Sequence, residues 1–202
     1  MISDLSGLPI GLLAAVQAAY AVPPRAYHHF GHVGDVLARA DEVAAGPGWR
    51  DPAAVRLAIL YHDAVYEPAR RDNEARSAVL AREHLARWDT GSDPDRVAAL
   101  VELTARHGRL GPDALADDPD AANFLDCDMA ILGAPPAVFD AYDRGIAAEY
   151  RGHVPGWLFA LQRRRFLAGL LAAPRIFLGD FFHGRLDAAA RANLRRAVNG
   201  KR

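Results

Sequence analysis

Helix start signals recur along this chain, and they constrain its fold more than any other feature. Asp51-Pro52 and Asp93-Pro94 each place an N-cap aspartate before a proline at the first helical position. The breaks that contain glycine and proline are short, and no segment shows the alternation of apolar and polar residues that is typical of a half-buried strand. The sequence therefore predicts an all-α fold. We expect helices over residues 27–45, 53–65, 72–88, 93–107, 121–132, 136–150, 155–172 and 186–198.

Length and composition favour a compact domain. The chain has 202 residues, of which 51% are hydrophobic and 24% are charged, and no linker or internal repeat divides it. We therefore predict one helical bundle that spans residues 1–202. The 24 basic and 25 acidic residues leave a net charge of −1. This balance argues against nucleic acids and membrane surfaces as partners, because sites for them normally need a basic excess.

The N-terminal region contains an apolar segment, Leu8–Val22, that includes the sequence Ala19-Tyr20-Ala21. These three residues resemble the small-x-small site at which signal peptides are cleaved, but no basic leader precedes the segment and Gln17 interrupts it. No apolar run reaches the roughly 20 residues that a membrane-spanning helix needs. Cys127 is the one cysteine, so no disulfide can form within the chain. We expect a cytoplasmic protein.

Two clusters of histidine and charged residues indicate chemistry rather than packing. His28 and His32 are four residues apart, which places them on one face of the expected helix, and Arg25 comes one turn earlier. His62-Asp63 lies near the end of the strongly apolar helix expected over residues 53–65, where packing alone would not select polar side chains. Each cluster also has an ordinary structural interpretation, as a solvated helix start and as an exposed helix end.

A third cluster, Asp126-Cys127-Asp128, lies inside an apolar segment of the helix expected over residues 121–132. Buried carboxylates are costly unless they are paired or bind a metal. Side chains that are two residues apart on a helix are separated by roughly 200° around its axis, so Asp126 and Asp128 cannot both face one point. We expect Cys127 to be a small buried apolar residue. Together, the imidazoles and carboxylates of the three clusters form a plausible ligand set for a divalent cation.

The order of these clusters resembles the HD superfamily of metal-dependent phosphohydrolases, whose ligand pattern is H…HD…D on a helical bundle. The resemblance extends to a bacterial subfamily of predicted HD phosphohydrolases of about this length, and it covers nearly the whole chain. The motifs that carry it are Tyr27-His28-x-x-x-His32-Val33, His62-Asp63-Ala64-Val65-Tyr66, Asp72-Asn73-Glu74-x-x-Ser77-Ala78 and Phe124-Leu125-Asp126-x-Asp128-x-x-Ile131-Leu132-Gly133.

The resemblance implies a metal site. Its ligands fall on His28, His62, Asp63 and Asp128, and the ion is one of Mn, Co, Ni, Fe, Zn or Mg. His29 departs from the family pattern, which leaves the choice between His28 and His29 open. Asp126 is expected to contact a ligand or the substrate. Because neutral imidazole is the ligand form, metal affinity should fall below about pH 6.5.

The same resemblance suggests roles around the metal. A divalent ion lowers the pKa of bound water and makes hydroxide available for attack on phosphorus. We expect Arg25 to bind a phosphoryl oxygen, His32 to contact the leaving group or a second phosphoryl oxygen, and Asp63 to orient the water as well as bind the metal. His107 is a candidate for contact with phosphate or with a second metal, and its alternative is a favourable position at a helix C-terminus.

The function that follows is hydrolysis of a small phosphorylated compound, for which a nucleotide is one candidate. Two alternatives stay open. The first is a regulatory HD domain that binds metal or nucleotide without turnover. The second is a di-iron oxygenase, which would require His84 and His107 to point inward, although His84 is expected on a helix surface. A homodimer is compatible with the sequence, which does not decide the oligomeric state.

Overall fold

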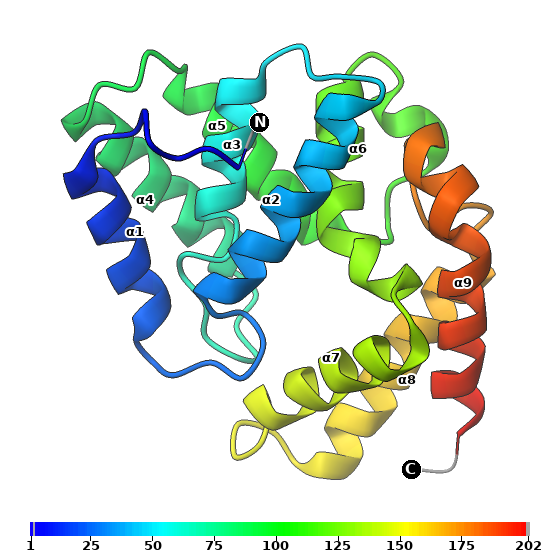
Figure 1. Ribbon diagram of the computed structural model, residues 1–202. Coiled ribbons are helices and arrows are strands. Elements are labelled where there is room, and N and C mark those ends of the chain that lie inside the picture. Colours follow the sequence, from blue (N-terminus) through cyan, green and yellow to red (C-terminus); the bar gives the residue numbers. More distant parts are fainter. Residues whose placement is uncertain (2, 201–202) are drawn as a thin grey trace.

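The computed structural model describes residue 1 and residues 3–200, and every regular element in these ranges is a helix (Figure 1). The all-α prediction is therefore confirmed. The α-helices are α1 (Ile10–Ala21), α2 (Phe30–Ala45), α3 (Pro52–Tyr61), α4 (Asn73–Arg87), α5 (Pro94–Leu103), α6 (Pro119–Met129), α7 (Pro136–Glu149), α8 (Gly156–Ala172) and α9 (Asp180–Asn199). Short 3₁₀ helices follow or precede three of them: η1 (Thr104–Arg106), η2 (Pro112–Leu115) and η3 (Ala130–Gly133).

The aspartate-proline signals start helices as predicted. The carboxylate of Asp51 accepts a hydrogen bond from the backbone N–H of Ala54 at 2.9 Å, and that of Asp93 accepts one from Asp95 at the same distance. The start expected at residue 27 is wrong by three residues, because His29 is the N-cap of α2 and its side chain accepts from the N–H of Gly31. This shift places His28 outside the helix.

The apolar N-terminal segment is the helix α1, which the sequence analysis did not predict. One face of α1 packs into the core through Leu12, Val16 and Tyr20. Among the described residues, no helix combines the length and the apolar character needed to cross a bilayer.

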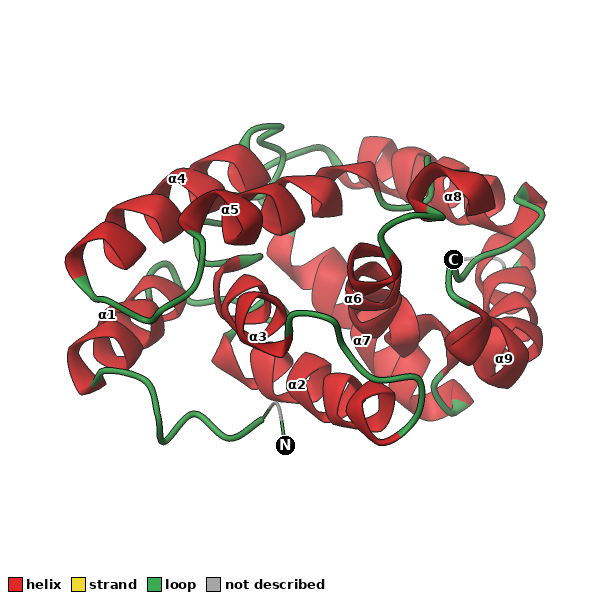
Figure 2. Cartoon of the chain, turned by 90° about the horizontal axis from the view of Figure 1, so that it is seen from above, coloured by secondary structure: helices red, strands yellow, loops and turns green. Residues whose placement is uncertain are grey.

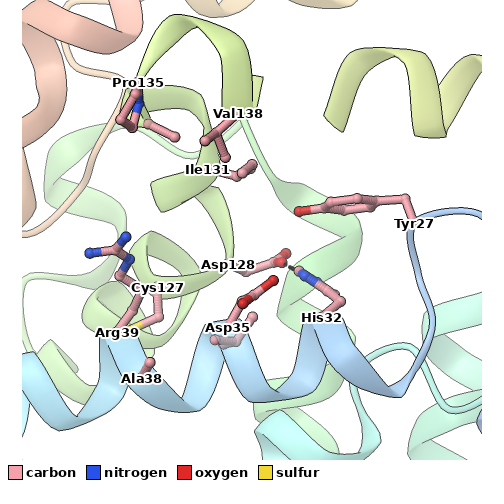
Figure 3. Close-up of a pocket in the computed structure, with 12 residues that line it drawn as sticks. Tyr27, His32, Asp35, Ala38, Arg39, Cys127, Asp128, Ile131, Pro135 and Val138 are labelled. Atoms are coloured by element: carbon pink, nitrogen blue, oxygen red, sulfur yellow. Dashed lines mark ion pairs between the residues drawn. The ribbon is translucent and has the colours of Figure 1, made fainter. Parts of the chain in front are cut away.

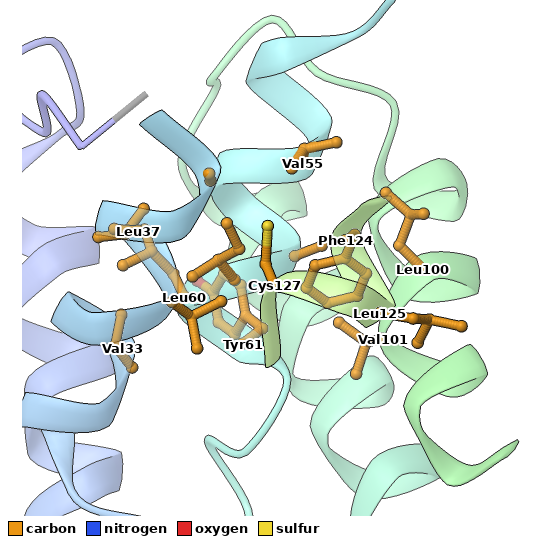
Figure 4. Packing of buried hydrophobic residues seen from close by; sticks show 14 of the residues in the cluster. Val33, Leu37, Val55, Leu60, Tyr61, Leu100, Val101, Phe124, Leu125 and Cys127 are labelled. Atoms are coloured by element: carbon orange, nitrogen blue, oxygen red, sulfur yellow. The ribbon is translucent and has the colours of Figure 1, made fainter. Parts of the chain in front are cut away.

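Helix α3 lies in the centre of the N-terminal half, with α2, α5 and α6 around it (Figure 2). Residues 57–61 of α3 are all buried, which explains why this segment is apolar on every side. Side chains of α2, α5 and α6 pack around it, among them Leu37, Leu100 and Phe124 (Figure 4). Cys127 is 2% exposed and belongs to this core, as predicted.

Helices α7, α8 and α9 form the C-terminal half, and α9 packs against both α8 and η3. The buried amide of Asn193 on α9 donates to the carbonyls of Leu132 and Ala134, at 2.9 and 2.8 Å, and so fixes the turn between α6 and α7. The C-terminal end of α7 reaches back to the loop before α2 through Glu149. This contact joins the two halves beside the residues that the sequence singled out.

Candidate metal centre

Three side chains converge where α2 passes the C-terminal end of α3. His32 lies on the first turn of α2, His62 is the C-cap of α3, and Asp63 follows directly. The Nε2 atoms of the two histidines are 3.1 Å apart, and Asp63 Oδ2 lies 3.1 Å from His62 Nε2 and 3.8 Å from His32 Nε2. One donor atom from each residue falls within 4.8 Å of the others, which is compatible with a shared metal ion.

The tautomer of His62 is set by the backbone. Its Nδ1–H donates to the carbonyl of Ile59 at 2.8 Å, one turn earlier on α3. In the neutral ring, Nε2 then carries a lone pair, and this lone pair faces both a carboxylate and another ring nitrogen. A metal ion among these atoms, a proton on His62, or the His32 tautomer that is protonated at Nε2 would each relieve the repulsion between the acceptors. The donor set therefore fits a metal ion or, in its absence, a proton.

Asp128 supplies a fourth donor from the last turn of α6. Its Oδ1 lies 3.0 Å from His32 Nε2 and 3.8 Å from His62 Nε2, and Figure 3 shows the carboxylate beside the His32 ring. His107 lies behind it, with Nδ1 3.4 Å from Asp128 Oδ2 and with a buried Nε2 that has no hydrogen-bond partner among the described residues. His32, His62, Asp63, Asp128 and His107 are thus brought together.

His28 takes a different position from the one expected of a ligand. Its Nδ1 donates to Glu149 Oε2 at 2.7 Å, and its Nε2 stays 4.0 Å from Asp63 Oδ2. The ring packs on Tyr66, with 4.2 Å between centroids. Its neighbour His29 is exposed and caps α2, so His29 lies outside the cluster. The geometry favours His32 over both His28 and His29 as the histidine ligand from this motif.

Glu149 is a residue of this site for which the sequence analysis gave no role. Its Oε1 accepts from the backbone N–H groups of Tyr27 and His28, at 2.8 and 2.9 Å, while Oε2 accepts from the His28 ring. A carboxylate in the last turn of a helix is opposed by the helix dipole, so the position of Glu149 at the end of α7 was an available signal.

The expectation that Arg25 contacts phosphate gains no support from this structure, because its terminal N–H groups are occupied. NH1 donates to the carbonyls of His28 and Asp63, and NH2 donates to those of Ala19 and Ala64. The guanidinium also lies against the rings of Tyr20 and Tyr66, 5.0 and 5.7 Å from their centroids. Arg25 therefore joins the end of α1, the loop before α2 and the His62-Asp63 turn.

Two further candidates face away from the cluster. Asp126 accepts hydrogen bonds from the N–H groups of Leu178 and Gly179, both at 2.7 Å, and burial raises its pKa to about 7. Asp126 and Asp128 therefore do point in different directions, as their spacing predicts. His84 contacts the hydroxyl of Tyr61 at 3.0 Å and the ring of Trp88, and it approaches none of the clustered residues.

The electrostatics of the cluster favour bound positive charge. Burial alone would raise the pKa values of Asp63 and Asp128, but the surrounding histidines hold both well below the usual range. Burial alone would lower the pKa of His62, yet these two carboxylates raise it to about 9. Burial lowers the pKa of His107. Without a metal, a proton on His62 therefore balances part of the negative charge.

A cavity of about 260 Å³ adjoins the cluster on the side of His32 and Asp128 (Figure 3). One wall is α2, and the other is formed by the end of α6, by η3 and by the start of α7. Much of the lining is apolar, and polar groups concentrate toward α2 and the cluster. The lining residues beyond His32 and Asp128 are Tyr27, Asp35, Val36, Ala38, Arg39, Cys127, Ile131, Ala134, Pro135 and Val138.

Comparison with known proteins identifies no relative of this chain: no family model, no curated protein and no solved structure matches it. The functional interpretation therefore depends on the residues and their geometry.

Proposed function

We propose that this protein is a metal-dependent phosphohydrolase that acts on a small phosphorylated compound. The observation that carries the proposal is the convergence of His62 Nε2, His32 Nε2 and the carboxylate of Asp63 in one largely buried cluster. Two ring nitrogens and a carboxylate so close together favour a cation among them. The combination of imidazole nitrogens and carboxylate oxygens is typical of sites for Mn, Fe, Co, Ni or Zn, and Mg remains a candidate.

The positions of helix ends support a cation at the same point. Helix α3 ends at Tyr61 and α6 ends at Met129, so both direct their C-terminal ends toward the cluster. A helix C-terminus carries the equivalent of roughly half a negative charge. These dipoles add to the carboxylates of Asp63 and Asp128, and they disfavour an anion in the cluster unless a metal is present.

We assign His32, His62, Asp63 and Asp128 as the residues that would hold the ion, and the role first expected of His32 passes to His28. A bound divalent ion would supply a nucleophilic water at neutral pH and would neutralise phosphoryl oxygens. Burial opposes a charged His28 ring, but the carboxylates of Asp63 and Glu149 raise its pKa, and the protonated ring would carry Nδ1–H to Glu149 and Nε2–H toward the cluster. In that form His28 is suited to give the Nε2 proton to the leaving group. His107 would orient Asp128. The position of His84 gives the di-iron alternative no support.

The test is metal content followed by turnover. Purified wild-type protein, His62→Ala and the control His153→Ala would be incubated with manganese, desalted and analysed for metal. His153 is exposed and is not one of the clustered residues. We expect about one ion per chain in the wild type and the control, and little in His62→Ala. Metal-loaded wild type should hydrolyse p-nitrophenyl phosphate or members of a nucleotide panel.

Two results would contradict the proposal. Equal metal content in His62→Ala and wild type would reject the site. Normal metal binding with no hydrolysis of any phosphoester would instead favour the non-catalytic binding domain. The cytoplasmic location and the small phosphorylated partner stay predictions.

A further inference from the structure

Asp35 places an unpaired carboxylate in the cavity beside the candidate metal centre. It lies one helical turn beyond His32 on α2. Figure 3 shows that the Asp35 carboxylate faces the same space as the Asp128 carboxylate and the Tyr27 hydroxyl. Among the described residues, no hydrogen bond or ion pair is formed by the Asp35 side chain. The metal cluster already has its donors, so Asp35 is available to a molecule that enters the cavity.

Arg39, the arginine among the residues that line this cavity, lies farther from the candidate metal centre than Asp35 does. At about 1.5 Å per residue, Asp35 is roughly 4.5 Å and Arg39 roughly 10.5 Å from His32 along the axis of α2. Arg39 forms an ion pair with Glu42, which also pairs with Arg185 at 3.1 Å. A short group attached to a phosphate at the metal centre therefore meets the carboxylate of Asp35 before it reaches a cation.

We infer that the cavity receives the alcohol part of the substrate, and that Asp35 selects leaving groups that carry an ammonium or hydroxyl group over leaving groups that carry a second anion. This inference rests on the proposed function, which places the phosphate at the metal. A carboxylate in a partly enclosed cavity is stabilised by a hydrogen-bond donor or cation and is destabilised by a like charge. The apolar wall of Ile131, Pro135 and Val138 would pack against the carbon atoms of the leaving group.

Three phosphonates test this selection without any need for turnover, because their carbon–phosphorus bond replaces the ester. The probes are 2-aminoethylphosphonate, 2-hydroxyethylphosphonate and 2-carboxyethylphosphonate, which differ in the group at the end of the same two-carbon chain. Their affinities would be measured by calorimetry on the full chain loaded with manganese. The proteins are wild type, Asp35→Asn and the control Asp117→Asn, whose altered side chain is also exposed but lies outside the cavity.

We expect wild type and Asp117→Asn to bind the amino probe at least about tenfold more tightly than the carboxy probe, with the hydroxy probe between them. Asp35→Asn should lose most of this ratio. Equal affinities in the wild type, an unchanged ratio in Asp35→Asn, or no binding of any probe would each overturn the inference.

Hydrolysis of p-nitrophenyl phosphate, measured on the same preparations, separates this inference from the proposed function. A binding ratio that depends on Asp35, without hydrolysis of this ester or of any member of the nucleotide panel, would reject the phosphohydrolase and retain the charge selectivity of the cavity. Hydrolysis with a ratio that does not depend on Asp35 would retain the phosphohydrolase and reject the role of Asp35.

Discussion

Replacement of Arg25 by alanine distinguishes a structural role from a role in phosphate binding. The substitution removes hydrogen bonds to four backbone carbonyls, those of Ala19, His28, Asp63 and Ala64. At about 1 kcal/mol for each bond, the expected loss of unfolding free energy is about 4 kcal/mol. For a chain of this size, that loss corresponds to a decrease in Tm of roughly 12 °C.

The assay is thermal and urea unfolding of metal-free protein, followed by metal titration of the folded variant. Because Arg25 holds the carbonyls of Asp63 and Ala64, we also expect metal affinity to fall on the order of tenfold. Arg164→Ala is the matched control, since this arginine on α8 is exposed, and its unfolding free energy should change by less than about 0.5 kcal/mol. A stable Arg25→Ala protein that loses only phosphate affinity would refute the structural role and restore the phosphate contact.

Three further results are expected. Glu149→Gln should lower kcat at least about tenfold in a hydrolysis assay while metal content stays unchanged, because it weakens the orientation of His28; unchanged kcat would remove His28 from proton transfer. The raised pKa of His62 moves the pH below which metal affinity falls from the 6.5 of an ordinary imidazole to about 9, because the proton on His62 must leave before the metal binds. Metal affinity, measured by titration across pH, should therefore weaken about tenfold per pH unit below about pH 9, and a flat profile from pH 9 to 7 would contradict the raised pKa. Phe124→Ala should lower the unfolding free energy by about 3–5 kcal/mol, because this ring is fully buried between α3 and α5; a loss below about 1 kcal/mol in urea unfolding would contradict the described core.

Local signals in the sequence were sufficient for most helices. Asp51-Pro52 and Asp93-Pro94 specify helix starts through contacts within a few residues, so no tertiary information is needed. Helix α1 was not predicted because Leu8–Val22 is mostly apolar and carries no start signal of this kind. Its helical state depends on packing, which a single sequence does not display.

The candidate site shows the same division between local and distant information. The sequence analysis gave candidate roles at the site to His32, His62, Asp63, Asp128 and His107, and the structure places all of them together. The separate roles of His28 and His32 were not predictable from their spacing, because that spacing was interpreted on a helix that in fact begins at Phe30. The contact that holds His28 comes from Glu149, 121 residues away. The spacing of the motifs therefore identified the group of residues, whereas the distant contact with Glu149 determines that His28 and His32 take different roles.

The C-terminal end of α3 explains why the metal ligands and Arg25 occur together. A buried helix end leaves carbonyl groups without partners, and it is stabilised by positive charge because of the helix dipole. Arg25 meets both requirements, since its guanidinium binds the carbonyls of Asp63 and Ala64 directly after α3. Ser77 on α4 donates to the carbonyl of Val65 at 3.2 Å and accepts from its N–H at 3.0 Å. With the backbone held on both sides, the side chains of His62 and Asp63 are free to face inward, where a cation would complete the same electrostatic balance.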